Sequence, residues 1–137
     1  MATPTPAQWQ IGLVGYGEVG RILAEDLRKQ GALVCAYDTQ LDLGQGTALR
    51  EHAAAIGVRL AATHAELAAG ADLIVSAVTA SQAVPVAQAC APTLKAGAWF
   101  LDFNSASPGA KQRAGALIDA AGGRYVEGAV MTSVPPY

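Results

Sequence analysis

Short apolar runs alternate along this chain with longer segments in which apolar residues recur every three or four positions. The first pattern is typical of strands buried on both faces, and the second is typical of amphipathic helices. We expect strands, in chain order, at Gln10–Val14, Leu33–Tyr37, Val58–Ala61, Leu73–Val78, Trp99–Phe103 and Arg124–Val130. We expect the intervening helices at Glu18–Gln30, Thr47–Ile56, Thr63–Ala69, Ser81–Ala91 and Pro108–Ala121.

Local signals support two of these helix boundaries. Thr63 and Glu66 have the spacing of a capping box, and Ser107 followed by Pro108 is typical of a helix N-terminus. Strands that are separated by crossover helices imply parallel pairing with right-handed connections. The pattern therefore predicts an α/β fold with a doubly wound parallel sheet in three αβα layers.

The first expected strand leads into a glycine-rich loop with the spacing Gly-x-Gly-x-x-Gly, at Gly15, Gly17 and Gly20. In a Rossmann-type sheet these glycines allow a sharp turn, leave room for a pyrophosphate and let the helix pack closely on the strand. Asp38 follows 18 positions after Gly20, at the end of the second strand, where a carboxylate accepts hydrogen bonds from the ribose hydroxyls. The alternative is a glycine-rich turn that binds no ligand.

These features predict a dinucleotide site for NAD, with NADP as the second choice, because a 2′-phosphate would meet the Asp38 carboxylate. The remaining residues of the loop are expected to contact the cofactor too: Tyr16, Glu18 and Val19.

Ligands of such sheets bind beyond the carboxyl ends of the strands. The segments that leave these ends are rich in small and hydroxyl residues: Gly15–Gly20, Asp38–Thr39, Val78–Ser81, Asn104–Ser107 and Met131–Val134. Val78 and Thr79 are therefore predicted to contact the cofactor.

The sequence offers no convincing proton donor in these segments and no metal-ligand spacing. We expect His52 and His64 to be exposed or structural, and Asp102 to brace the loop that follows it. The sequence thus predicts no catalytic residue and no metal site.

Composition narrows the class of protein further. The 137 residues suffice for one domain, and the net charge of −2 comes without a basic run, which argues against binding nucleic acid or an anionic membrane. No apolar stretch reaches the roughly 20 residues of a membrane span, and Met1–Gln8 lacks the order of a secretion signal. Cys35 and Cys90 are isolated and expected to be buried thiols, so a cytoplasmic location is predicted.

Three motifs in sequence resemble the N-terminal domain of the β-hydroxyacid dehydrogenases, which include 3-hydroxyisobutyrate and 6-phosphogluconate dehydrogenases and the imine reductases. They are the glycine loop, the segment Asp102–Pro108 and the segment Tyr125–Val130, and the resemblance covers about Gln10–Pro136. The family carries a Ser-Thr pair beside nicotinamide and substrate, where this chain has Asn104 and Ser105. The resemblance therefore implies that Asn104 contacts the cofactor and Ser105 the substrate.

The same resemblance implies the rest of the organisation. Where the family binds the substrate carboxylate with Ser-Gly-Gly, this chain has Met131, Thr132 and Ser133, which argues against 6-phosphogluconate or hydroxyisobutyrate as the substrate. The family's catalytic lysine and its all-helical domain, through which we expect the parent enzyme to form a homodimer, lie beyond Tyr137. We expect a flexible tail at 1–9, the dinucleotide-binding domain at 10–130 and the start of a connection to the helical domain at 131–137.

The predicted function is cofactor binding in an oxidoreductase that transfers hydride between a nicotinamide and a small hydroxy acid or related carbonyl. Two alternatives stay open: a domain of the imine reductase type, and a non-catalytic NAD(H)-binding module. The chain alone is expected to be inactive, because hydride transfer to a carbonyl needs a general acid that this chain does not provide.

Overall fold

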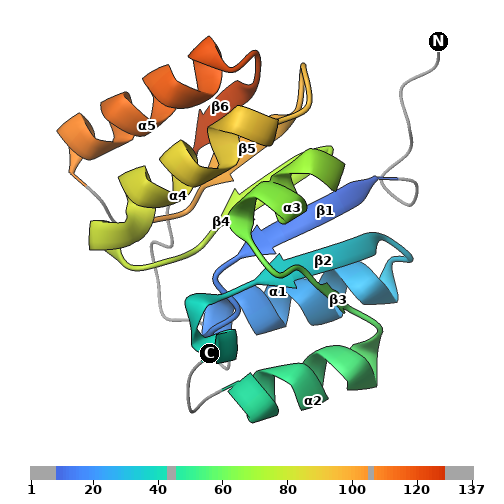
Figure 1. Cartoon of the computed structure of the whole chain (residues 1–137). Coiled ribbons are helices and arrows are strands. Elements are labelled where there is room, and N and C mark those ends of the chain that lie inside the picture. Colours follow the sequence, from blue (N-terminus) through green and yellow to red (C-terminus); the bar gives the residue numbers. More distant parts are fainter. Residues whose placement is uncertain (1–8, 43–45, 105–106, 129–137) are drawn as a thin grey trace, which may run out of the picture.

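The computed structural model describes residues 9–42, 46–104 and 107–128, which form a parallel six-stranded sheet between two layers of helices (Figure 1). The strands are β1 (Gln10–Val14), β2 (Leu33–Tyr37), β3 (Arg59–Leu60), β4 (Leu73–Ser76), β5 (Trp99–Asp102) and β6 (Arg124–Glu127). The helices are α1 (Glu18–Lys29), α2 (Gly46–Ile56), α3 (His64–Gly70), α4 (Ala83–Cys90) and α5 (Pro108–Ala120). Short 3-10 turns lie at η2 (Thr39–Asp42), η3 (Ala80–Gln82) and η4 (Ala91–Thr93).

The strand order is β3-β2-β1-β4-β5-β6. The chain runs outward from β1 to one edge, then returns to the other side of β1 and runs outward again. The doubly wound parallel sheet expected from the sequence is therefore confirmed. A sheet of this order has its ligand crevice beyond the carboxyl ends of β1 and β4, where the direction of winding changes.

Several element boundaries differ from the sequence-based expectation. Strand β5 ends at Asp102 instead of Phe103, and strand β6 ends at Glu127, before the expected Val130. Strand β4 ends at Ser76 instead of Val78, because the Val78 N–H donates to the side chain of Asn104 at 2.6 Å and so leaves the sheet ladder. The helix expected at Ser81–Ala91 is divided into η3, α4 and η4.

The core consists of two clusters, one on each face of the sheet. Val14, Ile74 and Phe100 pack under α3, α4 and α5, whereas Leu13 and Val75 pack against the layer of α1 and α2. Figure 1 shows α3, α4 and α5 together on one face, with α1 and α2 on the other. Neighbouring residues of one strand thus serve opposite clusters, as the pleat of a strand requires.

Two expectations from composition can be compared with the structure. Both cysteines are free, but only Cys90 is buried, whereas Cys35 in β2 is half-buried; the expectation of two buried thiols is wrong for Cys35 because β2 lies next to the edge of the sheet. Burial raises the pKa of Cys90 to about 12. No helix in the described ranges is long and apolar enough to cross a membrane.

Close backbone contacts fix the turn between β1 and α1. Gly15 has a φ of 94°, and a Cβ at this position would lie 2.1 Å from the carbonyl oxygen of Ala77. A Cβ at Gly20 would lie 2.1 Å from the carbonyl oxygen of Gly15. The first turn of α1 therefore packs directly on the loop, and the loop packs directly on the chain leaving β4.

We expect Gly20→Ala to lower the free energy of unfolding by about 1–3 kcal/mol, because the added methyl group must displace the Gly15 backbone. Gly109→Ala in the first turn of α5 is a matched control, since a Cβ there would meet only the end of Arg113 at 3.6 Å. Urea unfolding should show a lower midpoint for Gly20→Ala and an unchanged or higher one for Gly109→Ala. Equal midpoints would contradict the close packing.

Candidate functional site

A cleft of about 640 Å³ lies at the carboxyl edge of the sheet, within the usual range for small-molecule sites. It is formed by the glycine loop, the end of β2, the start of α3 and the segment from β4 into α4. The lining residues are Val14, Gly15, Gly17, Asp38, Thr39, His64, Ala77, Val78, Thr79, Gln82 and Val86. The structure thus brings together five of the residues predicted to contact the cofactor: Gly15, Gly17, Asp38, Val78 and Thr79.

Gly17 differs from the other two glycines of the loop in its surroundings. A Cβ at Gly17 would meet nothing within 4 Å, although the residue lines the cleft. Gly17 is also the N-cap of the 12-residue helix α1. Because glycine has no side chain, the cap residue makes no side-chain hydrogen bond to the first N–H groups of the helix. Open space beside free N–H groups at the start of a helix fits a pyrophosphate.

Asp38 ties the loop to the end of β2. Its Oδ2 accepts a hydrogen bond from the Tyr16 N–H at 2.7 Å, and the carbonyl of Tyr37 accepts one from the Gly15 N–H at 2.9 Å. Asp38 and Thr39 also line the cleft. The carboxylate is therefore both a support for the loop and a part of the cleft wall, at the position where such folds bind a ribose.

Asn104 is buried and acts within the protein. It is 2% exposed; its Oδ1 accepts the Val78 N–H at 2.6 Å, and its Nδ2 donates to Ser76 Oγ at 2.9 Å. The resemblance implied a direct contact with the cofactor, but in the structure both ends of the amide bind the chain leaving β4. Asn104 therefore braces Val78, which lines the cleft, and does not line it itself.

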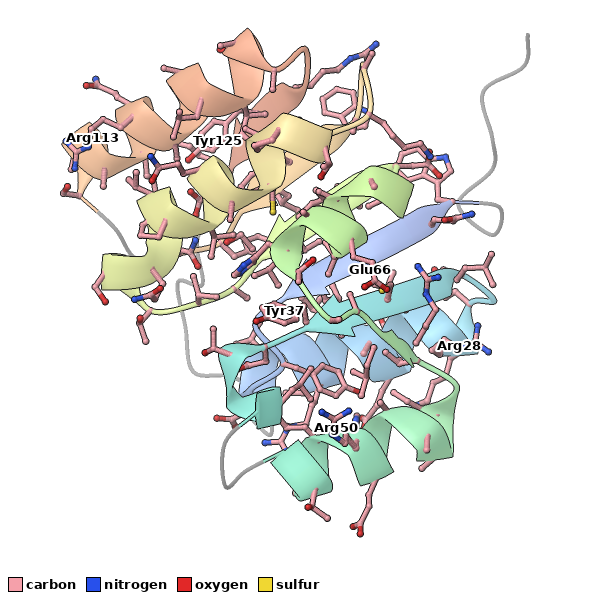
Figure 2. The ribbon with its side chains drawn as sticks, in the orientation of Figure 1. Arg28, Tyr37, Arg50, Glu66, Arg113 and Tyr125 are labelled. Atoms are coloured by element: carbon pink, nitrogen blue, oxygen red, sulfur yellow. The ribbon has the colours of Figure 1, made fainter. Side chains whose placement is uncertain are left out.

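Asp102 in turn holds Asn104 in position. Its Oδ1 accepts the Asn104 N–H at 2.8 Å and its Oδ2 accepts the Tyr125 hydroxyl at 2.7 Å, so the expectation that Asp102 braces its loop is confirmed. Tyr125 of β6, labelled in Figure 2, packs against Gly115 of α5, where an added Cβ would lie 3.1 Å from its ring. Burial, and then the Asp102 carboxylate, raise the pKa of Tyr125, which keeps its hydroxyl as the donor.

The other expected cofactor residues of the loop lie around the cleft and do not line it. The Tyr16 side chain is fully buried among the α1 and α2 core, and its hydroxyl lies 2.6 Å from His52 Nδ1. His52 also bonds Glu25, so its expected structural role is confirmed. Glu18 is exposed and Val19 half-buried on the first turn of α1. The predicted substrate residues lie outside the described residues: Ser105, Met131, Thr132 and Ser133.

His64 is a cleft residue that the sequence did not indicate. It begins α3 after the capping residue Thr63, and its ring lies edge-on to Tyr37, with 4.6 Å between ring centroids. Burial lowers the pKa of His64, so the imidazole is neutral at pH 7. The capping box correctly predicted the start of α3, since Thr63 Oγ1 accepts the Glu66 N–H at 3.1 Å. Only the winding of the chain brings this helix start beside the end of β2.

Known protein families include one whose model this chain matches. The chain matches the model of the NAD binding domain of 6-phosphogluconate dehydrogenase over residues 10–133. No protein with a curated function shows significant similarity in sequence.

Several solved structures share the fold of this chain. A conserved hypothetical protein from Sinorhizobium meliloti 1021 is 36% identical with a TM-score of 0.86. The match covers 95% of this chain and 44% of that protein. A 3-hydroxyisobutyrate dehydrogenase from Mycobacterium tuberculosis is 20% identical with a TM-score of 0.77, covering 88% of this chain and 40% of its own. An imine reductase variant from Myxococcus stipitatus, solved with NAD+, is 21% identical with a TM-score of 0.76. The match covers 92% of this chain and 42% of the reductase.

This chain thus spans less than half the length of the solved relatives that it matches. At 20–21% identity, the two named enzymes show the fold alone. The family follows from the model match over residues 10–133: the chain belongs to the NAD-binding domains of the 6-phosphogluconate dehydrogenase family.

Proposed function

We propose that this chain forms the cofactor half of an oxidoreductase acting on a small hydroxy acid or related carbonyl. The observation that carries the proposal is the cleft in which the open side of Gly17, the Asp38 carboxylate and the Val78–Thr79 segment meet. In this arrangement the N-terminus of α1 binds the pyrophosphate and Asp38 the adenosine ribose. The bound nicotinamide would supply or accept the hydride, while the chain binds and orients the cofactor.

Asp38 makes NAD the preferred cofactor in this proposal. A carboxylate accepts hydrogen bonds from ribose hydroxyls but repels a 2′-phosphate. Its hydrogen bond from the Tyr16 N–H fixes the carboxylate in the cleft wall. NADP remains the alternative cofactor, since a solved imine reductase from Myxococcus stipitatus holds NADP+ in the same fold.

The nicotinamide and substrate belong at the β4–β5 side of the cleft in this proposal. Thr79 lines that side, and Asn104 holds Val78 beside it. Ser105 and the residues Met131–Ser133 are proposed to contact the substrate, by resemblance to the family. The domain arrangement of the parent protein, with a helical domain after 131–137 and a dimer through it, is proposed on the same ground.

An imine reductase is the second candidate, favoured by the imine reductases among the solved relatives of this fold. Both candidates need the same cofactor cleft, so they differ in substrate and proton donor alone. Assays of the parent protein with a panel of hydroxy acids and a panel of cyclic imines would separate them. A non-catalytic NAD(H) module would turn over neither panel and still bind NADH.

We expect Gly17→Ala to weaken NADH binding about tenfold or more while leaving folding intact, because the methyl group enters space meant for the phosphates. No protein atom lies within 4 Å of that methyl group, so the unfolding free energy should change by no more than about 0.5 kcal/mol. Fluorescence titration with NADH gives the affinity, with Gly109→Ala as the control away from the cleft. Wild-type affinity in Gly17→Ala would place the phosphates elsewhere.

Asp38→Ala should weaken NADH binding more than NADPH binding, by roughly tenfold in the ratio, since a charge-assisted hydrogen bond to ribose is lost and a repulsion is removed. Asp38→Asn is the matched variant, because its amide oxygen can still accept the Tyr16 N–H. It should shift the ratio toward NADPH without loosening the loop. Equal or tighter NADPH binding by the wild-type chain would refute the preference for NAD.

The 137-residue chain alone should show no measurable hydroxy-acid dehydrogenase turnover while it binds NADH. A positioned general acid contributes roughly 10²–10⁴-fold to such a step. Among the described residues, the ionisable side chains that line the cleft are Asp38, which follows β2, and His64, which begins α3 and packs on Tyr37. Turnover close to that of a full-length relative would mean that the proton donor lies in this chain, and Ser105 would be the first residue to substitute.

A further inference from the structure

The glycine loop carries a tyrosine whose side chain leaves the cleft altogether. Tyr16 lies between Gly15 and Gly17, and its phenol is 0% exposed within the core under α1 and α2. Its hydroxyl lies 2.6 Å from His52 Nδ1 on α2, and His52 Nε2 lies 2.7 Å from Glu25 Oε1 on α1. A buried phenol thus has a polar connection to the surface through two side chains of increasing exposure, 21% for His52 and 48% for Glu25.

One arrangement of protons satisfies every group in this chain of hydrogen bonds. The Tyr16 hydroxyl donates to an unprotonated Nδ1, and the Nε2–H of His52 donates to the Glu25 carboxylate. The bond from His52 lowers the pKa of Glu25, and burial together with the Glu25 charge raises the pKa of Tyr16 to about 12. The Tyr16 hydroxyl therefore stays a donor, and the Glu25 carboxylate stays an acceptor.

The other end of Tyr16 belongs to the cleft. Its backbone N–H donates to Asp38 Oδ2 at 2.7 Å, and Asp38 lines the cleft wall. The residues on either side, Gly15 and Gly17, also line the cleft. A displacement of the phenol would therefore move the loop backbone and release the carboxylate together.

We infer that His52, which does not line the cleft, is a positioning residue for the dinucleotide site. It holds Tyr16, and Tyr16 holds the glycine loop and Asp38 in the geometry that binds the cofactor. The inference rests on the proposed function of the cleft. Helix α2 would then influence cofactor affinity through His52, although His52 does not line the cleft.

A second link between the same helices provides a matched control. Arg28 of α1 donates through Nε to the Ile56 carbonyl at the end of α2, at 3.0 Å, and through Nη1 to the Ala32 carbonyl at 2.7 Å (Figure 2). This link also joins α1 to α2 but makes no contact with Tyr16. Loss of helix packing alone would therefore be seen in Arg28→Ala as well.

Two substitutions of His52 separate positioning from simple stability. In His52→Asn the amide sits where Nδ1 sits and can still accept the Tyr16 hydroxyl, whereas in His52→Gln it sits near Nε2 and serves Glu25 only. Glutamine is the better helix former, so a purely structural role would favour His52→Gln. We expect the reverse order for NADH affinity: His52→Asn within about twofold of wild type, and His52→Gln weaker by about fivefold to tenfold, the value of one lost hydrogen bond.

NADH titration of the chain and its variants gives the first readout. Tyr16→Phe, which keeps the ring and loses only the hydroxyl, should match His52→Gln, and Arg28→Ala should bind as the wild type does. Equal affinities for His52→Asn and His52→Gln, or an equal loss in Arg28→Ala, would overturn the inference.

Hydrogen exchange at the Tyr16 amide gives a second readout that needs no cofactor. This amide is the donor to Asp38, so its exchange should be about fivefold faster in His52→Gln than in His52→Asn. If the wild-type chain fails to bind NADH, the proposed function fails while the exchange rates still decide the inference. Equal exchange in the two variants refutes the positioning role.

Discussion

The contact of the glycine loop with the chain leaving β4 is the constraint on which the rest of this structure depends. Gly15 touches the Ala77 carbonyl and Gly20 touches the Gly15 carbonyl, each at a distance that leaves no room for a Cβ. These contacts bring the N-terminus of α1 to the point where the winding of the sheet reverses. The cleft, the open side of Gly17 and the place of Asp38 all follow from that approach.

Buried hydrogen bonds hold the two sides of the cleft independently. On the β4–β5 side, Asp102 accepts the Asn104 N–H and Asn104 accepts the Val78 N–H, and these bonds fix the position of the Val78 segment. On the β2 side, Asp38 and Tyr16 do the same for the glycine loop. Burying these polar groups has a cost unless each is satisfied, and no buried side-chain nitrogen or oxygen in the described residues lacks a partner. The polar groups that hold the cleft are therefore satisfied within the protein itself.

Some site residues could be predicted because their signal is local. Gly15, Gly17 and Gly20 are recognisable from spacing after a strand, and Asp38 from its place at the end of the next one. Asn104 and His64 could not be placed in this way. Asn104 has the sequence position of a ligand contact, yet its orientation depends on Ser76 and Val78, which are distant in the chain. His64 has only the local signal of a helix start.

The sequence by itself determined the α/β class, the bounds of β1 and β2, the parallel pairing and the dinucleotide loop, because apolar periodicity and glycine spacing act over a few residues. Tertiary structure alone decided which polar groups face the cleft and which face the protein. That choice depends on which strand ends become neighbours, as in the pairing of β4 with β5 that turns Asn104 inward. It also depends on which helices cross, as in the approach of α2 to α1 that brings His52 onto Tyr16. Such long-range neighbours leave no periodic trace in a single sequence.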